Sequence, residues 1–344
     1  MKPTPSLFAR LLPRLLAFAA LCVSCASQAG GGYAARPEIA EFIAEMHERH
    51  GFATEDLQRL FGDAQMLPTV IKYILPPSTP RQRSWRAYRP RYIDGTRITA
   101  GLDFWRRHET AIKAASAQYG VPPEIIVSII GVETVYGRNV GNFQTFSALT
   151  TLAFDYPPRA ELFRRELAEL LLLAREGGRD VREFRGSYAG ALGLPQFLPS
   201  SWRKYAVDFD NDGSIDLFAS PNDAIGSVAR FLNEHGWTPG APIAQRVSAI
   251  DGQIKPLLDA GIEPQFNTDE ADSLGVRTAT PAPPATRYAL IDLVTPDEPT
   301  EYWLGFQNFY VITRYNRSSF YAMSVYQLGE ALRTAWESRQ RVGR

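Results

Sequence analysis

The sequence predicts a mainly α-helical protein with a smaller β-containing insertion in its second half, α+β overall. Apolar residues recur at helical spacing through most of the chain up to residue 240. Proline and threonine then cluster at 279–286, short alternating runs lie on either side of residue 300, and helical spacing returns near the C-terminus. The 344 residues, 45% of them hydrophobic, are enough for one large domain or for two to three smaller packed lobes.

The charge of the chain is balanced, with 37 basic and 37 acidic residues. This balance argues against a nucleic-acid binder with a basic surface, so we expect no nucleic-acid partner. Both cysteines, Cys22 and Cys25, lie in the first 25 residues. A product cleaved after them holds no internal disulfide, and we expect it to fold by core packing alone.

Residues 1–25 are predicted to be an export signal. Basic residues precede an apolar run at 15–23, which is about half the ~20 residues that a membrane-spanning helix needs. The segment Cys22–Ala26 resembles a bacterial lipobox, in which Cys25 becomes the lipidated N-terminus of the mature protein. The alternative is ordinary cleavage near Ala29, which yields a soluble periplasmic protein.

Residues 34–120 are expected to form an N-terminal helical lobe. Apolar residues at helical spacing predict a helix over 38–50, and Thr54 is expected to cap a second one. A stretch rich in proline and arginine follows at 76–89, and a long helix is predicted from about 96 to 119.

Three further helices are predicted in the middle of the chain. The first begins at Pro122 or Pro123, where a missing N–H costs nothing, and closes at Gly137. The others span 159–176 and 222–235, and glycine follows the end of each.

The pattern of residues changes after residue 240. We expect a small β-containing lobe over 241–300, with short strands predicted from alternation at 288–294 and at 309–313. The segment 301–344 is expected to complete the helical lobe with a last helix over 319–336.

Glu133 is a candidate catalytic residue because it is an acid on the apolar stripe of a predicted helix. It follows Ile129 by four residues and Ile130 by three, so it shares their face. Moving an ionised carboxylate into such surroundings is costly, and a raised pKa is the usual response. A glutamic acid protonated at neutral pH is a general acid. The alternative is that Glu133 turns to solvent or pairs with Arg138.

The residues around Glu133, and a second stretch further on, are typical of a ligand site. Gly131 and Gly137 flank the acid and would leave room for a bulky ligand to approach the backbone. Residues 186–202 mix small residues, polar tips and aromatic rings, which suits sugar binding. By composition alone this stretch equally fits a tightly turned loop with no ligand.

Segments 130–137, 187–202 and 312–317 together resemble the membrane-bound lytic murein transglycosylase B family, whose catalytic core is similar to goose-type lysozyme. The resemblance runs from about Trp85 to Trp336, with three motifs in the right order. It implies a lysozyme-like catalytic core over 121–240 and peptidoglycan glycan strands as the substrate. Further partners that it implies are the outer membrane, reached through a lipid anchor, and other enzymes of the wall.

The resemblance implies that Glu133 is the sole catalytic acid, and that the C-terminal segment completes the cleft. The cleft residues that it implies are Ser187, Gln196, Tyr315 and Asn316, and the aromatic residues Tyr188 and Tyr156 are further cleft candidates. The alternatives are a helix or turn cap for Ser187, a solvent-facing side chain for Gln196, and core packing for Tyr188 and Tyr156. Tyr136 and Phe197 are open to the same two interpretations, sugar stacking or packing.

Residues 208–216 follow the start of an EF-hand calcium loop, with aspartates at alternating positions and Gly213 at the sharp turn. The twelfth position, where a glutamate normally closes the loop, is Ala219. The family carries a lengthened loop, so the resemblance implies a structural Ca²⁺ site over 208–223. Its ligands would be Asp208, Asp210, Asp212, the carbonyl of Ser214, and Asp223. The alternative is a solvated acidic turn that holds no ion.

The implied reaction cleaves the MurNAc-β-1,4-GlcNAc bond without water. Glu133 would protonate the leaving oxygen and then deprotonate the C6 hydroxyl of the same sugar, which closes onto C1 as a 1,6-anhydro ring. Because this nucleophile is tethered within the substrate, no second carboxylate is needed. Two alternatives stay open: a lysozyme-type hydrolase with Asp155 as second acid, and an inactive calcium-dependent wall-binding scaffold.

Overall fold

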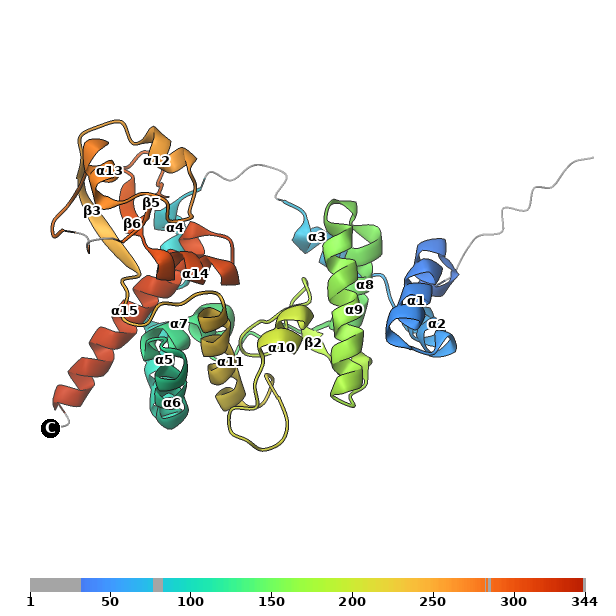
Figure 1. The fold of residues 1–344 in the computed structure, drawn as a ribbon. Helices are drawn as coiled ribbons and strands as arrows, with labels where there is room; N and C mark the ends of the chain where they lie inside the picture. The colour runs from blue at the N-terminus through green and yellow to red at the C-terminus, as the bar shows by residue number, and fades with distance from the viewer. Residues whose placement is uncertain (1–31, 77–82, 282, 284–285, 343–344) are drawn as a thin grey trace, which may run out of the picture.

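The computed structural model describes residues 32–76, 83–281, 283 and 286–342. The predicted export signal and Cys25 lie outside the described residues. Within the described part of the chain, no helix combines the length and the apolar character needed to cross a membrane. The molecule is elongated, with N-terminal helices at one end and a small sheet at the other (Figure 1).

The helices at the N-terminal end pack around a long helical hairpin. They are α1 (Pro37–His50), α2 (Thr54–Asp63), α3 (Pro68–Ile74), α8 (Thr145–Asp155) and α9 (Ala160–Glu176), with short 3₁₀ turns at 33–35, 157–159 and 181–183. Phe42 and Phe61 of the first two helices pack their rings against Phe154 of α8. The expected helices over 38–50 and 159–176 are confirmed. Thr54 is the first residue of α2 rather than its cap, which is Ala53.

The range expected to form one N-terminal lobe divides into two parts. After the helices that pack with α8 and α9, the range continues with α4 (Trp85–Tyr88), a 3₁₀ turn at 89–91, α5 (Gly95–Arg107) and α6 (Glu109–Tyr119). These elements lie on the far side of α9 from α1 and α2, toward the end that holds the small sheet (Figure 1). The single long helix predicted over 96–119 is wrong, because His108 leaves the helical conformation between α5 and α6 (φ −117°, ψ 24°).

Helix α7 (Pro123–Thr134) is the centre of the second helical group. It touches α5, α6, α11 (Pro221–Glu234) and α15 (Ser319–Val342). Neighbours therefore surround it, and it is buried on almost every face rather than along one apolar stripe. It also ends earlier than predicted: Val135 and Tyr136 adopt left-handed φ of 51° and 58°, so the helix stops before Gly137.

The expected β-containing lobe is a four-stranded antiparallel sheet in the order β4-β3-β6-β5. Its strands are β3 (Ala244–Ile250), β4 (Val276–Thr278), β5 (Ala289–Leu293) and β6 (Glu301–Gly305). Helices α12 (Lys255–Asp259) and α13 (Thr268–Ser273) accompany the sheet. The strand predicted at 288–294 is confirmed as β5, but the sheet continues to residue 305, beyond the boundary expected at 300.

The strand predicted at 309–313 is wrong, because these residues form α14 (Gln307–Tyr315). Short apolar runs fit a strand and a buried helix equally well, and packing against α15 decides for the helix. The final helix, α15, extends beyond the predicted residue 336 to Val342.

Two small elements connect the helical groups. Strands β1 (Phe143–Gln144) and β2 (Arg185–Gly186) pair Phe143 with Gly186, and α10 (Pro199–Tyr205) touches both α9 and α11. The chain from β2 to α10 therefore lies between the N-terminal helical end and the group around α7 (Figure 1).

Candidate active site

Glu133 lies in the last turn of α7 and is only partly buried, unlike its neighbours on the helix. The hydroxyl of Tyr321, on α15, donates a hydrogen bond of 2.6 Å to Glu133 Oε1. Arg138, the alternative partner, is exposed. The carboxyl is therefore held by a neutral donor.

The protonation of Glu133 is governed by two opposing effects. Burial raises its pKa, and the hydrogen bond from Tyr321 stabilises the ionised form and lowers it, with the result at about 7. A carboxyl with this pKa is protonated in about half of the molecules at neutral pH, which suits a group that first donates a proton and later accepts one.

Three tyrosines lie close enough to Glu133 for its charge to affect their pKa values. The rings of Tyr315 and Tyr321 are 6.5 Å apart and inclined by 15°. Burial, and then the charge of Glu133, raise the pKa of both phenols well above the ordinary value. Burial also raises the pKa of Tyr88, with Glu133 contributing. All three therefore remain neutral hydrogen-bond donors.

Sequence reasoning missed Tyr321 and Tyr88. A signal existed for Tyr321, which precedes Val325 by four residues and Leu328 by seven and so lies on the buried stripe of the last helix. A tyrosine on such a stripe needs a partner for its hydroxyl. Tyr88 lies within the stretch rich in proline and arginine at 76–89 and gave no comparable signal.

The loop before α10 is tied to the chain that follows Glu133. The Gln196 amide donates to the carbonyls of Val140 (3.0 Å) and Gly193 (2.9 Å). The Thr134 hydroxyl donates to the carbonyl of Leu194 at 2.9 Å. The alternative was a solvent-facing Gln196 side chain. Its amide instead forms both hydrogen bonds within the protein and holds this loop in place.

Tyr315 and Gln196 meet at one cavity. The Tyr315 hydroxyl donates to the carbonyl of Pro195 at 2.6 Å, which joins α14 to the loop. Both residues line a cavity of about 310 Å³ next to α10 and α11, with Lys204, His235 and Arg314 also on its wall. The structure thus brings together two of the predicted cleft residues.

The other predicted cleft residues have different surroundings. Ser187 is partly buried, and its hydroxyl accepts a hydrogen bond of 3.0 Å from the Ala191 backbone, as a turn cap does. Tyr188 is partly buried and Asn316, just after α14, is exposed. Tyr156 is 9% exposed and belongs to the core at the end of α8, which agrees with the packing alternative.

The expectation that Gly131 makes room for a ligand is wrong. A Cβ at Gly131 would lie 2.4 Å from the Tyr136 hydroxyl, and one at Gly101 would lie 2.3 Å from it. The two glycines therefore make room for the Tyr136 ring, which packs on Phe104 at 5.4 Å. Phe197 is also a core residue, 2% exposed.

Asp155, the alternative second acid, is engaged elsewhere. Its carboxylate pairs with Arg36 at 2.7 Å and accepts a hydrogen bond from the Tyr33 hydroxyl. These contacts fasten the first described residues to α8. These partners give the Asp155 carboxylate a structural role. In the described part of the chain, none of its contacts involves Glu133.

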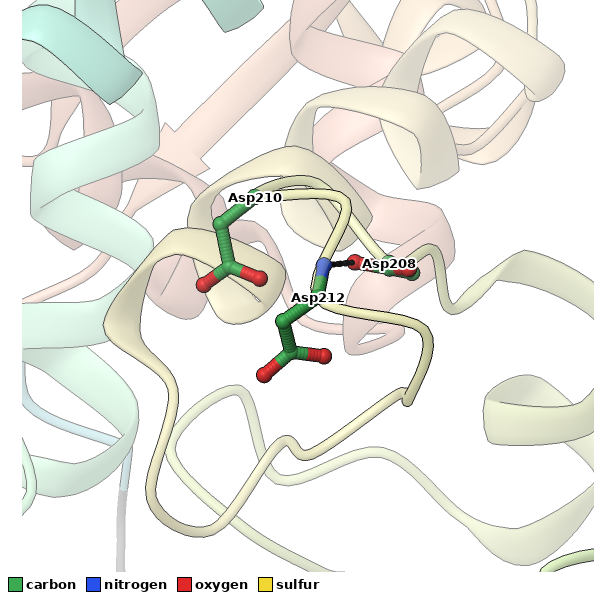
Figure 2. A group of neighbouring side chains, drawn as sticks. All are labelled: Asp208, Asp210 and Asp212. Carbon is green, nitrogen blue, oxygen red and sulfur yellow. Dashed lines mark hydrogen bonds between the residues drawn. The ribbon is translucent and has the colours of Figure 1, made fainter.

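The acidic loop gathers three carboxylates (Figure 2). One oxygen from each of Asp208, Asp210 and Asp212 lies within 4.8 Å of the others. Asp208 also accepts hydrogen bonds from the backbone of Asp212 (3.1 Å) and Gly213 (2.8 Å), which shapes the turn. Hard oxygen ligands crowded in this way fit Ca²⁺.

Asp223 lies beneath this loop and is 1% exposed. Its two oxygens accept hydrogen bonds of 2.8 Å from the backbone of Phe209 and of Asp216, so it joins the two ends of the loop. Burial raises its pKa, and the charges of Asp210 and Asp208 raise it further. The Ser214 hydroxyl is exposed and donates a hydrogen bond to the Asp212 carboxylate.

A mainly helical fold whose buried central helix ends in a glutamate with a raised pKa is the arrangement of a glycan-cleaving enzyme of the lysozyme-like class. Residues 34–330 match the family described as "Transglycosylase SLT domain". The chain belongs to this family, and it is a peptidoglycan lytic transglycosylase. The resemblance found in the sequence is confirmed.

Three similar proteins support this assignment. The chain is 41% identical to Membrane-bound lytic murein transglycosylase B of Escherichia coli K12 over 319 residues, which is 90% of this chain and 86% of that protein. The soluble lytic transglycosylase SltB1 of Pseudomonas aeruginosa is 47% identical, with a TM-score of 0.80 over 87% of this chain and 99% of that one. The E. coli lytic transglycosylase Slt35 in complex with calcium is 40% identical, with a TM-score of 0.78 over 89% and 96%.

Proposed function

We propose that Glu133 carries out both proton transfers of the transglycosylase reaction. It gives its proton to the glycosidic oxygen as the bond to C1 of N-acetylmuramic acid breaks. The carboxylate so formed takes the proton of the C6 hydroxyl, whose oxygen bonds to C1 and closes the 1,6-anhydro ring. Glu133 ends protonated and ready for another turnover. The observation that carries this proposal is the Glu133 carboxyl at the end of α7, which accepts a hydrogen bond of 2.6 Å from Tyr321 and whose pKa burial raises to about 7.

The surrounding residues have supporting roles in this proposal. Tyr321 positions the carboxyl and stabilises its ionised form between the two transfers. Tyr315, Gln196, Ser187, Tyr188 and Asn316 are proposed to bind the glycan. Tyr156 is not proposed to do so, because it is buried in the core. The engagement of Asp155 with Arg36 leaves no observation in favour of the hydrolase alternative.

Product analysis tests the proposal. Purified murein is digested with the enzyme, and the released fragments are weighed by mass spectrometry. An anhydro product is lighter by one water than the reducing sugar that a hydrolase releases. We expect anhydro ends alone. Reducing ends would establish hydrolysis, and binding without release of fragments would favour the wall-binding scaffold.

We also propose that the loop over 208–223 holds a structural Ca²⁺ ion. The ligands would be Asp208, Asp210, Asp212 and the carbonyl of Ser214. Asp223 would be a further ligand, or it would support the loop through its hydrogen bonds to the backbone. Two observations support this: the crowded oxygens of the loop, and the calcium complex of Slt35 among similar structures. The ion would stiffen the loop between α10 and α11 and take no part in proton transfer.

We propose a lipid anchor on Cys25 and a location at the inner face of the outer membrane. The support is the lipobox-like segment and the membrane-bound name of the E. coli relative. The test is the variant Cys25→Ser, expected to move the protein from the membrane fraction to the soluble periplasmic fraction. If wild type is itself soluble and begins near residue 30, ordinary cleavage is correct.

A further inference from the structure

The segment around α3 exposes large apolar side chains close to the turn that contains Ser187 and Tyr188. The exposed fractions are 52% for Met66, 56% for Tyr73 and 51% for Leu75. In the described part of the chain, only Ile215, at 43%, is a further large hydrophobic residue of this kind. Single exposed apolar residues are ordinary, but three within ten residues, together called the patch below, distinguish this segment from the rest of the described surface.

The Tyr73 ring is held in a defined orientation by two other rings. It meets Phe143 edge-on, at 6.0 Å and 89°, and Tyr188 at 5.8 Å and 61°. Edge-to-face contacts of this kind contribute on the order of 1 kcal/mol each. The ring is held at these two contacts, and because the residue is 56% exposed, part of its surface stays open to a ligand. The three rings, Tyr73, Phe143 and Tyr188, are called the aromatic platform below.

The platform adjoins the part of the site that contains Ser187. Phe143 pairs with Gly186 across β1 and β2, and Tyr188 follows Ser187 directly. Gly141 lies so close to this turn that a Cβ there would be 2.5 Å from the Ser187 backbone nitrogen. The platform is therefore continuous with the loop that is tied to the chain after Glu133, although α3 is distant from both in sequence.

The size of the platform favours a sugar ring over a protein partner. A tyrosine offers about 150–250 Å² in total, so a half-exposed one leaves on the order of 100 Å². A stable protein interface needs about 800 Å² from each partner. A sugar ring needs only one aromatic face, and the substrate of this enzyme is a polymer longer than the bond that it breaks.

We propose that the aromatic platform binds a sugar ring of the glycan strand beyond the residues that surround Glu133, with Tyr73 as the stacking surface. This inference rests on the proposed function of the Glu133 site. It assigns the N-terminal helical end a part in substrate binding, and it makes affinity depend on the length of the strand.

The test compares Tyr73→Ala, Tyr73→Phe and Met66→Ala on uncrosslinked murein strands separated by length. Met66 is as exposed as Tyr73 but has no ring contact, which makes it the matched control. We expect Tyr73→Ala to raise KM about fivefold to tenfold on long strands, with little change in kcat and a smaller loss on a tetrasaccharide. Tyr73→Phe is expected to restore most of the affinity, and Met66→Ala to behave as wild type.

Several outcomes would overturn the inference. An equal loss on all strand lengths would show that Tyr73 only supports the fold. An unchanged KM on long strands would show that no sugar binds there. Self-association of wild type that Tyr73→Ala abolishes would assign the patch to a second copy of the chain. Failure of the proposed function is seen separately, in the products of wild type.

Discussion

The two acidic regions of this protein use the same chemical group in opposite ways. At the end of α7, one carboxyl is partly buried, and burial with one phenol hydroxyl sets its pKa at about 7. In the loop after α10, the carboxylates of Asp208, Asp210 and Asp212 are crowded within 4.8 Å in a largely exposed turn.

The difference shows that surroundings, rather than residue type, decide what a carboxylate does. An isolated carboxyl in a poorly solvated place lowers its energy by keeping a proton. Crowded carboxylate groups that remain open to water repel one another, and a divalent cation relieves their repulsion. The first arrangement is suited to proton transfer and the second to holding an ion.

The largest expected effect is on turnover at Glu133. Glu133→Gln keeps the shape and an acceptor for Tyr321 but cannot give or take the proton, so we expect kcat to fall about a thousandfold. Release of anhydro fragments from murein measures it. Glu124→Gln is the matched control, since Glu124 lies in the first turn of the same helix. Turnover of Glu133→Gln within tenfold of wild type would remove Glu133 from the mechanism.

The same substitution should stabilise the protein above neutral pH. Because the pKa of Glu133 rises from 4.5 to about 7 on folding, ionising it costs about 3 kcal/mol of stability. This cost is absent below about pH 4.5, grows from there to pH 7, and is complete above. We expect Glu133→Gln to exceed wild type by about 3 kcal/mol at pH 8 and by little at pH 4.5.

Urea unfolding at the two pH values measures this difference. The exposed Glu45 provides the control, since Glu45→Gln is expected to leave the pH dependence of stability unchanged. A Glu133→Gln protein no more stable than wild type at pH 8 would mean that the carboxyl is well solvated, which contradicts its assigned pKa.

In the acidic loop, we expect a stability effect that depends on calcium. Wild type should gain about 2.7 kcal/mol at a Ca²⁺ concentration a hundred times the Kd. The double variant Asp210→Asn, Asp212→Asn should gain nothing. With a chelator present, the variant should be at least as stable as wild type because the repulsion is relieved.

Thermal melting with Ca²⁺ and with chelator measures both quantities. Asp259→Asn, at an exposed aspartate paired with Lys255, is the control. A wild-type melting curve that Ca²⁺ does not move would leave the loop as a solvated acidic turn.

The smallest expected effect concerns the hydrogen bond at Glu133. Tyr321→Phe removes a donor to the ionised form, so the pKa of Glu133 should rise further and the alkaline limb of the pH–rate profile should move up by about one pH unit. We expect kcat to fall about tenfold. Tyr326→Phe is the control, since Tyr326 lies on the same helix but donates its hydroxyl hydrogen bond to the Ala244 carbonyl. A shift of the limb to lower pH would contradict the role of Tyr321.

Local patterns predicted much of the fold and the central residue of the site. Helices α1, α9 and α11 and strand β5 follow from spacing and their end signals, because these depend on neighbours in sequence. The assignment of 309–313 as a strand failed, since a short apolar run does not distinguish the two periods. The break at His108 and the early end of α7 depend on backbone conformations that no local pattern showed.

The sequence by itself determined the family, the acid at position 133, the acidic loop and the small sheet after residue 240. Only the tertiary structure showed that Tyr321 holds that acid, that Gly101 accommodates the Tyr136 ring, and that α3 brings Tyr73 to the turn at Ser187. The reason is physical: these contacts join segments up to 188 residues apart, and such pairings are selected by packing of the whole chain rather than by any local preference.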